Sequence, residues 1–362
     1  MASQLLPISS TFAGRRHTLR PAVSSRLAVL IAGGLLLSAC NPPAGDEFRH
    51  GLADQARPWA HANFDADPGK FTFAVFSDLT GGERPGIYDV AVAQLNLLRP
   101  ELIMSVGDLI EGDSADTAGL NAEWDRFDSR SGKARAPVFY TGGNHDLTGQ
   151  MLRDVWRDRY GPSYYHFVYK DVLFLVLDTE DNTPERMAWL KQVRDEALEF
   201  VAVDDWEGYA ASDYANAPER AYGNIRPAQA DYFIDAIESH PDARWVFLFI
   251  HKPIWQREDE AEFARIEAAL SKRPYTVFRG HQHAFIYEQR HGRDYIGLGP
   301  TGGSWNAAAG RSMDQVVLVT VDDAGVNIAN LLLPGILDKT GQIPANGDGL
   351  CYESTDCEDS AE

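Results

Sequence analysis

The chain has 362 residues, with 33 lysines and arginines against 53 aspartates and glutamates, so its formal net charge is −20 at pH 7. This length is enough to bury one substantial hydrophobic core or two smaller ones. So large an acidic surplus repels nucleic acid and anionic membranes, which excludes binding to either through overall charge. An anionic substrate therefore needs a local reversal of the electrostatic field.

The first 39 residues have the pattern of a signal peptide. Four arginines and no acidic residue occur in residues 1–40, and the apolar run 27–39 leads directly into Cys40. This run is too short for a membrane span, which needs about 20 residues, but it suits the apolar middle of an export signal. The ending L-S-A-C resembles the lipobox of bacterial lipoproteins. An uncleaved anchor and an ordinary signal peptide are the alternatives.

The lipobox resemblance implies cleavage before Cys40 and lipidation of that cysteine. The mature protein is then expected on the bacterial cell envelope, held to the membrane by its lipid. Asn41 favours sorting to the outer membrane, facing the periplasm. Polar residues with scattered proline and glycine follow, so residues 40–69 are predicted to include the lipidated cysteine and a tether.

Residues 70–335 are predicted to form one domain, because no linker interrupts them. Strand-like and helical patterns alternate early and strands follow one another later, which predicts an α/β fold with a two-sheet mixed β-sandwich flanked by helices. Apolar, β-rich runs predict strands at 71–77, 102–106, 137–141, 165–168, 172–177, 245–250, 275–279, 284–288, 315–321 and 326–333. Helical spacing predicts helices around 87–98, 119–129, 151–159, 184–199, 227–239 and 259–271.

Two segments break this pattern. Residues 200–224 are acidic, aromatic and rich in turn-forming residues, and are predicted to be an insertion that is either a lid or a packed surface excursion. Residues 336–362 are acidic and are predicted to be a mobile C-terminal tail. This tail contains Cys351 and Cys357, which either form a disulfide, as an exported protein permits, or remain free thiols.

Five of the predicted strands are followed by residues that can hold a metal ion. These residues are Asp78, Asp108, the run Asn144-His145-Asp146, His251, and the run His281-Gln282-His283. Because ligands gather at the carboxyl ends of strands in α/β sheets, the five strand ends are expected to converge. Carboxylates, imidazoles and a carboxamide without any thiolate suit Mn, Fe, Zn or Mg and argue against a structural cysteine-type zinc site.

Two cations joined by a bridging carboxylate would fit this donor set. Such a pair polarises a phosphoryl group and lowers the pKa of a bound water towards neutrality. It also reverses the local field of an acidic protein, which is what an anionic substrate requires.

The ordered motifs resemble those of the calcineurin-like metallophosphoesterases over residues 70 to about 300. They are D-L-T from Asp78, G-D-L-I-E from Gly107, G-N-H-D from Gly143, H-K-P from His251 and G-H-Q-H from Gly280. The resemblance implies an α/β/β/α architecture with a dinuclear metal centre at the strand ends. It implies that Asp108 bridges two metal ions, one completed by Asn144, His251 and His281 and the other by Asp78 and His283. It further implies that His145 assists the leaving group and that Asp146 orients His145.

Thr80 departs from the family pattern, because a histidine ligand is usual at this position. A neutral threonine hydroxyl is a poor metal ligand. The purple acid phosphatase branch also lacks this histidine and uses a tyrosine three residues after the bridging aspartate, the spacing at which Glu111 stands here. We hypothesise that Glu111 is the missing ligand; a solvated loop glutamate or an indirect partner is the alternative. An oxygen-rich site favours Mn or Fe over Zn for the two divalent or trivalent ions.

These features predict a lipid-anchored hydrolase of phosphate monoesters or diesters, in which a metal-bound hydroxide attacks phosphorus. The alternative is a non-catalytic metal-binding envelope lipoprotein, in which Thr80 marks a degraded first metal site. A calcium-binding surface protein ranks last, because the acidic tail lacks the spacing of an EF-hand loop. The sequence leaves the oligomeric state and the physiological substrate open.

Overall fold

The computed structural model describes residues 48, 59–61 and 63–353 of the chain. The chain forms two compact units, residues 1–64 and residues 65–362. Every helix and strand of the described residues belongs to the second unit. None of these helices combines the length and the apolar character needed to cross a bilayer.

The predicted signal peptide and Cys40 lie outside the described residues, so both stay predictions. Part of the predicted tether is described. In the first unit, the ring of Phe48 packs edge-on against that of Trp59, with the ring centroids 5.3 Å apart.

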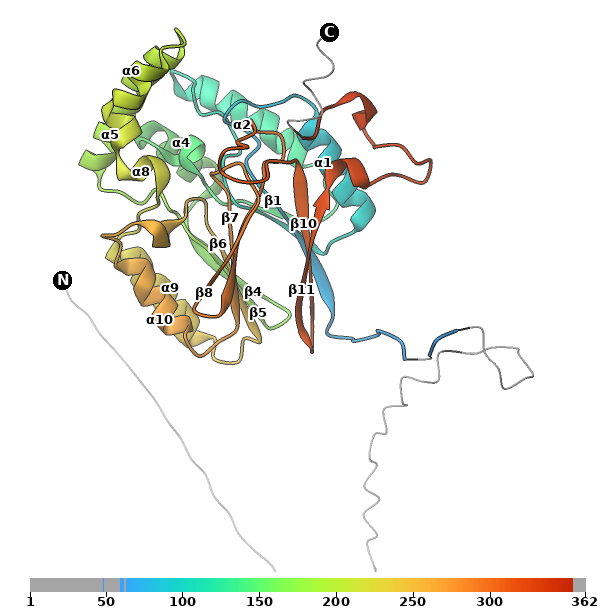
Figure 1. Ribbon diagram of the computed structural model, residues 1–362. Coiled ribbons are helices and arrows are strands. Elements are labelled where there is room, and N and C mark those ends of the chain that lie inside the picture. Colours follow the sequence, from blue (N-terminus) through green and yellow to red (C-terminus); the bar gives the residue numbers. More distant parts are fainter. Residues whose placement is uncertain (1–47, 49–58, 62, 354–362) are drawn as a thin grey trace, which may run out of the picture. The chain divides into compact units, whose positions relative to one another are not determined.

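The second unit contains two mixed β-sheets (Figure 1). The first sheet has the strand order β11-β10-β1-β2-β3, and the second has the order β4-β5-β6-β7-β9-β8. Each sheet contains a parallel block, β1-β2-β3 in the first and β5-β6-β7-β9 in the second. Antiparallel pairings flank this block on one side in the first sheet, through β10 and β11, and on both sides in the second, through β4 and β8. The strands are β1 (Phe71–Phe76), β2 (Leu102–Ser105), β3 (Val138–Phe139), β4 (Tyr165–Tyr169), β5 (Val172–Val176), β6 (Trp245–Phe249), β7 (Tyr275–Arg279), β8 (Ile286–Arg290), β9 (Arg293–Gly297), β10 (Gln315–Asp322) and β11 (Gly325–Leu332).

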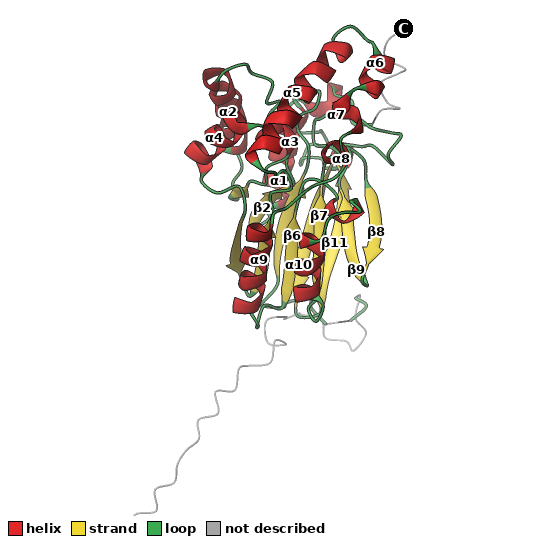
Figure 2. Ribbon diagram, turned by 90° about the vertical axis from the view of Figure 1, so that its left-hand side faces the viewer, coloured by secondary structure: helices red, strands yellow, loops and turns green. Residues whose placement is uncertain are grey.

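Helices cover the outer face of each sheet. Apolar residues of α1, α2 and α4 share one core with the first sheet, and those of α9 and α10 share another with the second sheet. Figure 2 shows α9 and α10 lying across the strands. The helices are α1 (Ile87–Leu98), α2 (Thr117–Ser131), α3 (Asn144–Leu147), α4 (Gln150–Tyr160), α5 (Pro184–Val201), α6 (Trp206–Ala211), α7 (Asp213–Asn216), α8 (Pro218–Ala221), α9 (Pro227–Ser239) and α10 (Glu262–Leu270), with short 3-10 turns at Ile254–Gln256, Leu333–Gly335 and Gly347–Gly349. The predicted α/β/β/α architecture is confirmed.

The packing of strand β1 explains why its sequence is apolar without interruption. Phe73 and Val75 contribute to the core between the two sheets, whereas Ala74 and Phe76 contribute to the core beneath α1, α2 and α4. Successive side chains of a strand point to opposite faces, and here both faces are covered. The chain therefore leaves β1 inside the protein, so the aspartate that follows the strand is buried as well.

Two segments differ from the sequence-based expectation. Strand β9 was not predicted, because its sequence R-D-Y-I-G begins with charged residues, although Tyr295 is fully buried. The insertion is helical: α5 continues to Val201, and α6, α7 and α8 follow.

The start of the mobile C-terminal tail was also predicted too early in the chain, at residue 336. Tyr352 is only 3% exposed and packs in the core of the first sheet, together with Ile343 and Leu350. The folded domain therefore extends to at least residue 353. Cys351 is disulfide-bonded. Cys357 lies outside the described residues, so the pairing of these two cysteines stays a prediction.

Candidate metal centre

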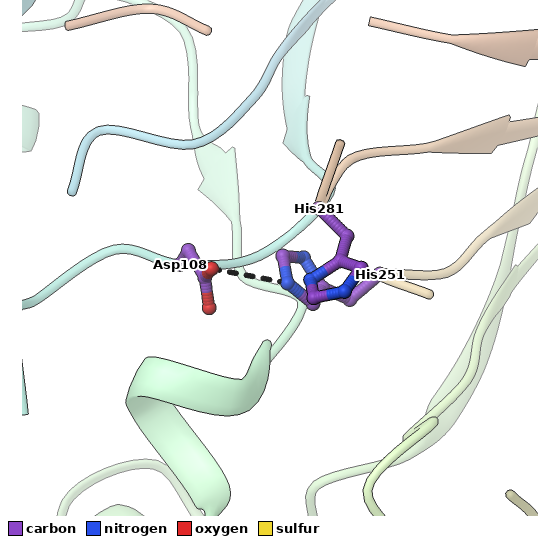
Figure 3. A group of neighbouring side chains, drawn as sticks. All are labelled: Asp108, His251 and His281. Carbon is purple, nitrogen blue, oxygen red and sulfur yellow. Dashed lines mark ion pairs between the residues drawn. The ribbon is translucent and has the colours of Figure 1, made fainter. Parts of the chain in front are cut away.

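The strand ends of both sheets converge, as the sequence predicted. Two groups of metal-ligating side chains form there, and the ligand atoms within each group lie within 4.8 Å of one another. The His251 group consists of Asp108, His251 and His281, and the Asp78 group of Asp78, Asp108 and His283. Figure 3 shows the His251 group, in which both imidazoles lie on the same side of the Asp108 carboxylate. Asp108 belongs to both groups, which is the position that a bridging ligand must have.

Short distances join the side chains within each group. The Nε2 atom of His251 lies 3.1 Å from Oδ2 of Asp108 and 3.1 Å from Oδ1 of Asn144. The Nε2 atom of His283 lies 3.3 Å from Oδ1 of Asp78. Asn144 is therefore placed where it can add a fourth donor to the His251 group.

The second ring nitrogen of each imidazole is bound to a backbone carbonyl. Nδ1 of His251 lies 2.9 Å from the carbonyl of Val106, Nε2 of His281 lies 2.8 Å from that of Arg220, and Nδ1 of His283 lies 2.6 Å from that of Ser304. Because a carbonyl can only accept, each of these nitrogens carries a hydrogen, which leaves the opposite ring nitrogen as the one that can face a metal ion. This is the usual arrangement around metal-binding histidines, so the side chains fit a metal centre.

The backbone is strained at the same residues. Asp78, Asp108, His281 and His283 have positive φ angles of 22°, 57°, 72° and 51°. Such conformations cost about 1–3 kcal/mol each and persist where the surrounding structure enforces them, typically at functional sites. Glycine is also required for steric reasons at the start of the G-N-H-D motif, because a Cβ atom at Gly143 would lie 2.3 Å from Oδ1 of Asp108.

Burial and charge set the protonation of the His251 group. Burial disfavours the charged forms of Asp108 and His251, but their mutual attraction outweighs it, so the pKa of Asp108 lies well below its usual value and that of His251 rises to about 9. Burial and the positive charges of Lys252 and His251 hold the pKa of His281 well below its ordinary value. His281 is therefore neutral, the form of imidazole that binds metal.

Asp146 does not contact the imidazole of His145, contrary to the prediction. Its carboxylate accepts hydrogen bonds from the backbone N–H groups of Gly143, Leu109 and Ile110, at 2.8, 2.9 and 3.2 Å. The imidazole of His145 is instead oriented by the carbonyl of Glu111, 2.6 Å from Nδ1. Asp146 thus fixes the two loops that follow β2 and β3.

Glu111 belongs to neither group of candidate ligands. Its carboxylate accepts hydrogen bonds from the N–H groups of Gly81, Gly82 and Glu83, at 3.0, 3.1 and 2.8 Å. The hydroxyl of Thr80 lies 3.1 and 2.9 Å from the carbonyls of Asp108 and Ile110. These contacts do not support the hypothesis that Glu111 replaces the histidine missing at Thr80. The contacts of Glu111 show that its carboxylate holds the turn after β1 against the loop after β2.

Glu111→Ala is expected to keep both metal equivalents while lowering the free energy of unfolding by about 1.5–3 kcal/mol, because hydrogen bonds to a charged acceptor are lost. Metal content measured by elemental analysis and urea denaturation check this expectation. If the variant instead loses one metal equivalent, Glu111 is a ligand after all.

A pocket of about 330 Å³ lies beside the His251 group. Asn144, His145 and His281 line it from the strand ends, and Tyr209, Tyr214 and Arg220 line it from the insertion. These last three residues were not among the predicted site residues. The only signal for them was the aromatic composition of 200–224, which did not indicate which side chains face the centre.

Residues 71–285 match the family model described as calcineurin-like phosphoesterase. Among solved structures, the chain is similar to a dimetal phosphatase from Danio rerio, at 13% identity and a TM-score of 0.48, over 72% of this chain and 98% of that one. It is also similar to a purple acid phosphatase from yellow lupin (Lupinus luteus), at 13% identity and a TM-score of 0.45, over 73% of this chain and 52% of that one. No curated protein matches the sequence.

Proposed function

The chain belongs to the calcineurin-like phosphoesterase family, and we propose that it hydrolyses phosphate esters with the help of two bound metal ions. The observation that carries this proposal is that one buried carboxylate, Asp108, belongs to both groups of candidate ligands. One ion would be held by Asp108, Asn144, His251 and His281. The other would be held by Asp78, Asp108 and His283, a set with two carboxylates and one imidazole that favours Mn or Fe over Zn.

Two cations held there would lower the pKa of a bound water towards neutrality, so that it can serve as the nucleophile, and would neutralise charge on the phosphoryl oxygens. The residues around the two ions hold the catalytic loops in place and provide a proton. Because Nδ1 of His145 donates to the carbonyl of Glu111, Nε2 is the ring nitrogen that can face the substrate, and in the imidazolium form it would give its proton to the oxygen of the leaving group. Asp146 and Glu111 hold the loops that carry Asp108 and His145.

The experiment that tests this function combines metal analysis with hydrolysis of aryl phosphate monoesters and diesters in the presence of Mn, Fe or Zn. We expect two metal equivalents per chain and turnover that a chelator abolishes and added metal restores. His145→Gln is expected to keep the metal and lower kcat about 10²–10⁴-fold, the usual contribution of a general acid.

The second candidate is a non-catalytic metal-binding protein of the envelope. It is favoured by Thr80, whose hydroxyl contacts backbone carbonyls and leaves the Asp78 group with one imidazole. Stoichiometric metal without turnover towards either ester would select this candidate and reject hydrolysis.

Attachment to the bacterial outer membrane through a lipid on Cys40 belongs to the proposal as well. It is supported by the lipobox-like sequence and by the disulfide bond of Cys351, since disulfides persist in oxidising compartments. Cys40→Ala is expected to move the protein from the membrane fraction to the soluble fraction. Unchanged membrane association of this variant would reject lipid anchoring at Cys40.

A further inference from the structure

Helix α8 of the insertion is fastened to the metal centre through its backbone. The carbonyl of Arg220 accepts a hydrogen bond from Nε2 of His281 at 2.8 Å. The preceding carbonyl, of Glu219, accepts a hydrogen bond from the buried ammonium of Lys252 at 2.6 Å. Two consecutive peptide groups are therefore fixed by residues of the strand ends, which places Arg220 beside a candidate metal ligand.

The side chain of Arg220 is exposed and only partly engaged. Its Nε donates to the hydroxyl of Tyr209 at 2.9 Å, and its guanidinium lies 5.7 Å from the centroid of that ring. Among the described residues, its terminal nitrogens have no hydrogen-bond or ion-pair partner. The neighbouring carboxylate of Glu219 is already paired with Arg186 and Arg257. Arg220 is thus held at Nε by Tyr209, and its two terminal nitrogens can bind a ligand.

The pocket around Arg220 differs in charge from the rest of the protein. Of its described lining residues, Arg220 is the one with a permanent charge, and none is an aspartate or glutamate. This is unusual for a chain with a net charge of −20. A guanidinium presents a planar fork of donors that matches the oxygens of a phosphate. The side of the pocket that the insertion forms is therefore positively charged and attracts an anion.

We propose that Arg220 binds the non-bridging oxygens of the scissile phosphate and makes this site selective for phosphomonoesters over phosphodiesters. The inference rests on the proposed function. A phosphomonoester dianion has one more negative charge and one more non-bridging oxygen than a diester monoanion, and a guanidinium at the pocket wall favours both features. The pocket has a volume of about 330 Å³, at the small end of ligand sites.

Arg220→Gln tests this proposal, because it removes the charge from an exposed side chain. We expect kcat/KM for an aryl phosphate monoester to fall about 30-fold and that for a bis-aryl phosphate to fall less than about 3-fold, since charge-assisted hydrogen bonds to the extra charge are lost. Tyr209→Phe removes the hydroxyl that orients Nε, so we expect a smaller loss of about 3-fold for the monoester alone.

Binding provides a readout that is independent of turnover. Calorimetric titration of the metal-loaded protein with inorganic phosphate is expected to give about 10-fold weaker binding in Arg220→Gln, with binding of dimethyl phosphate unchanged. Arg265→Gln is the matched control. Arg265 is an exposed arginine of α10, paired with Asp231 and Glu262 and absent from the pocket lining. This control is expected to behave as wild type in both assays.

The outcomes separate this inference from the proposed function. Equal losses for both esters in Arg220→Gln, or a wild-type protein that prefers the diester, would overturn selectivity while leaving hydrolysis intact. If the metal-loaded wild type hydrolyses neither ester, the proposed function fails. The phosphate titration still decides the role of Arg220 in that case, because unchanged phosphate affinity in Arg220→Gln rejects it.

Discussion

Asp108→Asn is expected to lower kcat/KM for phosphate esters by about 10²–10³-fold or more, the scale of losing a principal electrostatic contact of a catalytic site. Asp108 is 2% exposed and belongs to both groups of candidate ligands, so one substitution weakens both metal sites. Asparagine keeps the shape of the side chain and the acceptor for the N–H of His145, which lies 2.9 Å from Oδ1. The loss is therefore expected to come from the missing charge.

Metal content and steady-state kinetics measured on the same preparation check this prediction. The bound metal should fall from two equivalents to one or fewer. Asp113→Asn is the matched control, because Asp113 lies in the same loop and its side chain is 57% exposed, 3.1 Å from Arg194. This control is expected to keep its metal content and kcat/KM, because Asp113 belongs to neither group of candidate ligands. Asp108→Asn with two metal equivalents and full activity would contradict the bridging role.

Lys252→Met is expected to lower the free energy of unfolding by about 3–5 kcal/mol, because removing one partner of a buried ion pair leaves the other charge uncompensated. The Nζ atom of Lys252 lies 2.9 Å from both carboxylate oxygens of Glu180, and the two side chains are only 3% and 4% exposed. The same ammonium binds the carbonyl of Glu219. The substitution is thus expected to loosen α8 as well, and with it the pocket wall.

Urea denaturation at several pH values measures this effect. Burial raises the pKa of Glu180 even with Lys252 present. Without Lys252 this folded-state pKa is expected to rise further above the unfolded value, so stability is lost as the pH rises. The defect should therefore be large at pH 7 and shrink below about pH 4.5, where Glu180 is protonated in both states.

Two further variants separate the ion pair from general effects of substitution. Lys252→Met combined with Glu180→Gln is expected to regain about half of the lost stability, because no buried charge remains unpaired. Lys191→Met is the control: Lys191 is 37% exposed and pairs with Asp195 on α5, so a loss below about 0.5 kcal/mol is expected. A Lys252→Met variant as stable as this control would show that the pair is unimportant.

Much of the fold and of the metal centre was predictable from the sequence. Runs such as 71–77 and 245–250 are apolar because β1 and β6 are covered on both faces, so their length and position define the central strands. Polar residues that end such runs must lie at the carboxyl edge of a sheet, and parallel strands share that edge. Asp78 and Asp108 could therefore be placed together before any coordinates were known. Strand β6 belongs to the other sheet, so the meeting of His251 with them depends on how the two sheets pack.

The tertiary structure alone decided what the remaining polar residues do. Glu111 stands at the spacing of a ligand, yet its carboxylate is taken up by the amides of Gly81, Gly82 and Glu83, about 30 positions earlier in the chain. The carbonyl of Arg220 meets His281 across 61 positions. Periodicity and spacing report which face of an element is buried. They do not report contacts between distant loops, because those depend on how the elements pack and on which donors are already satisfied.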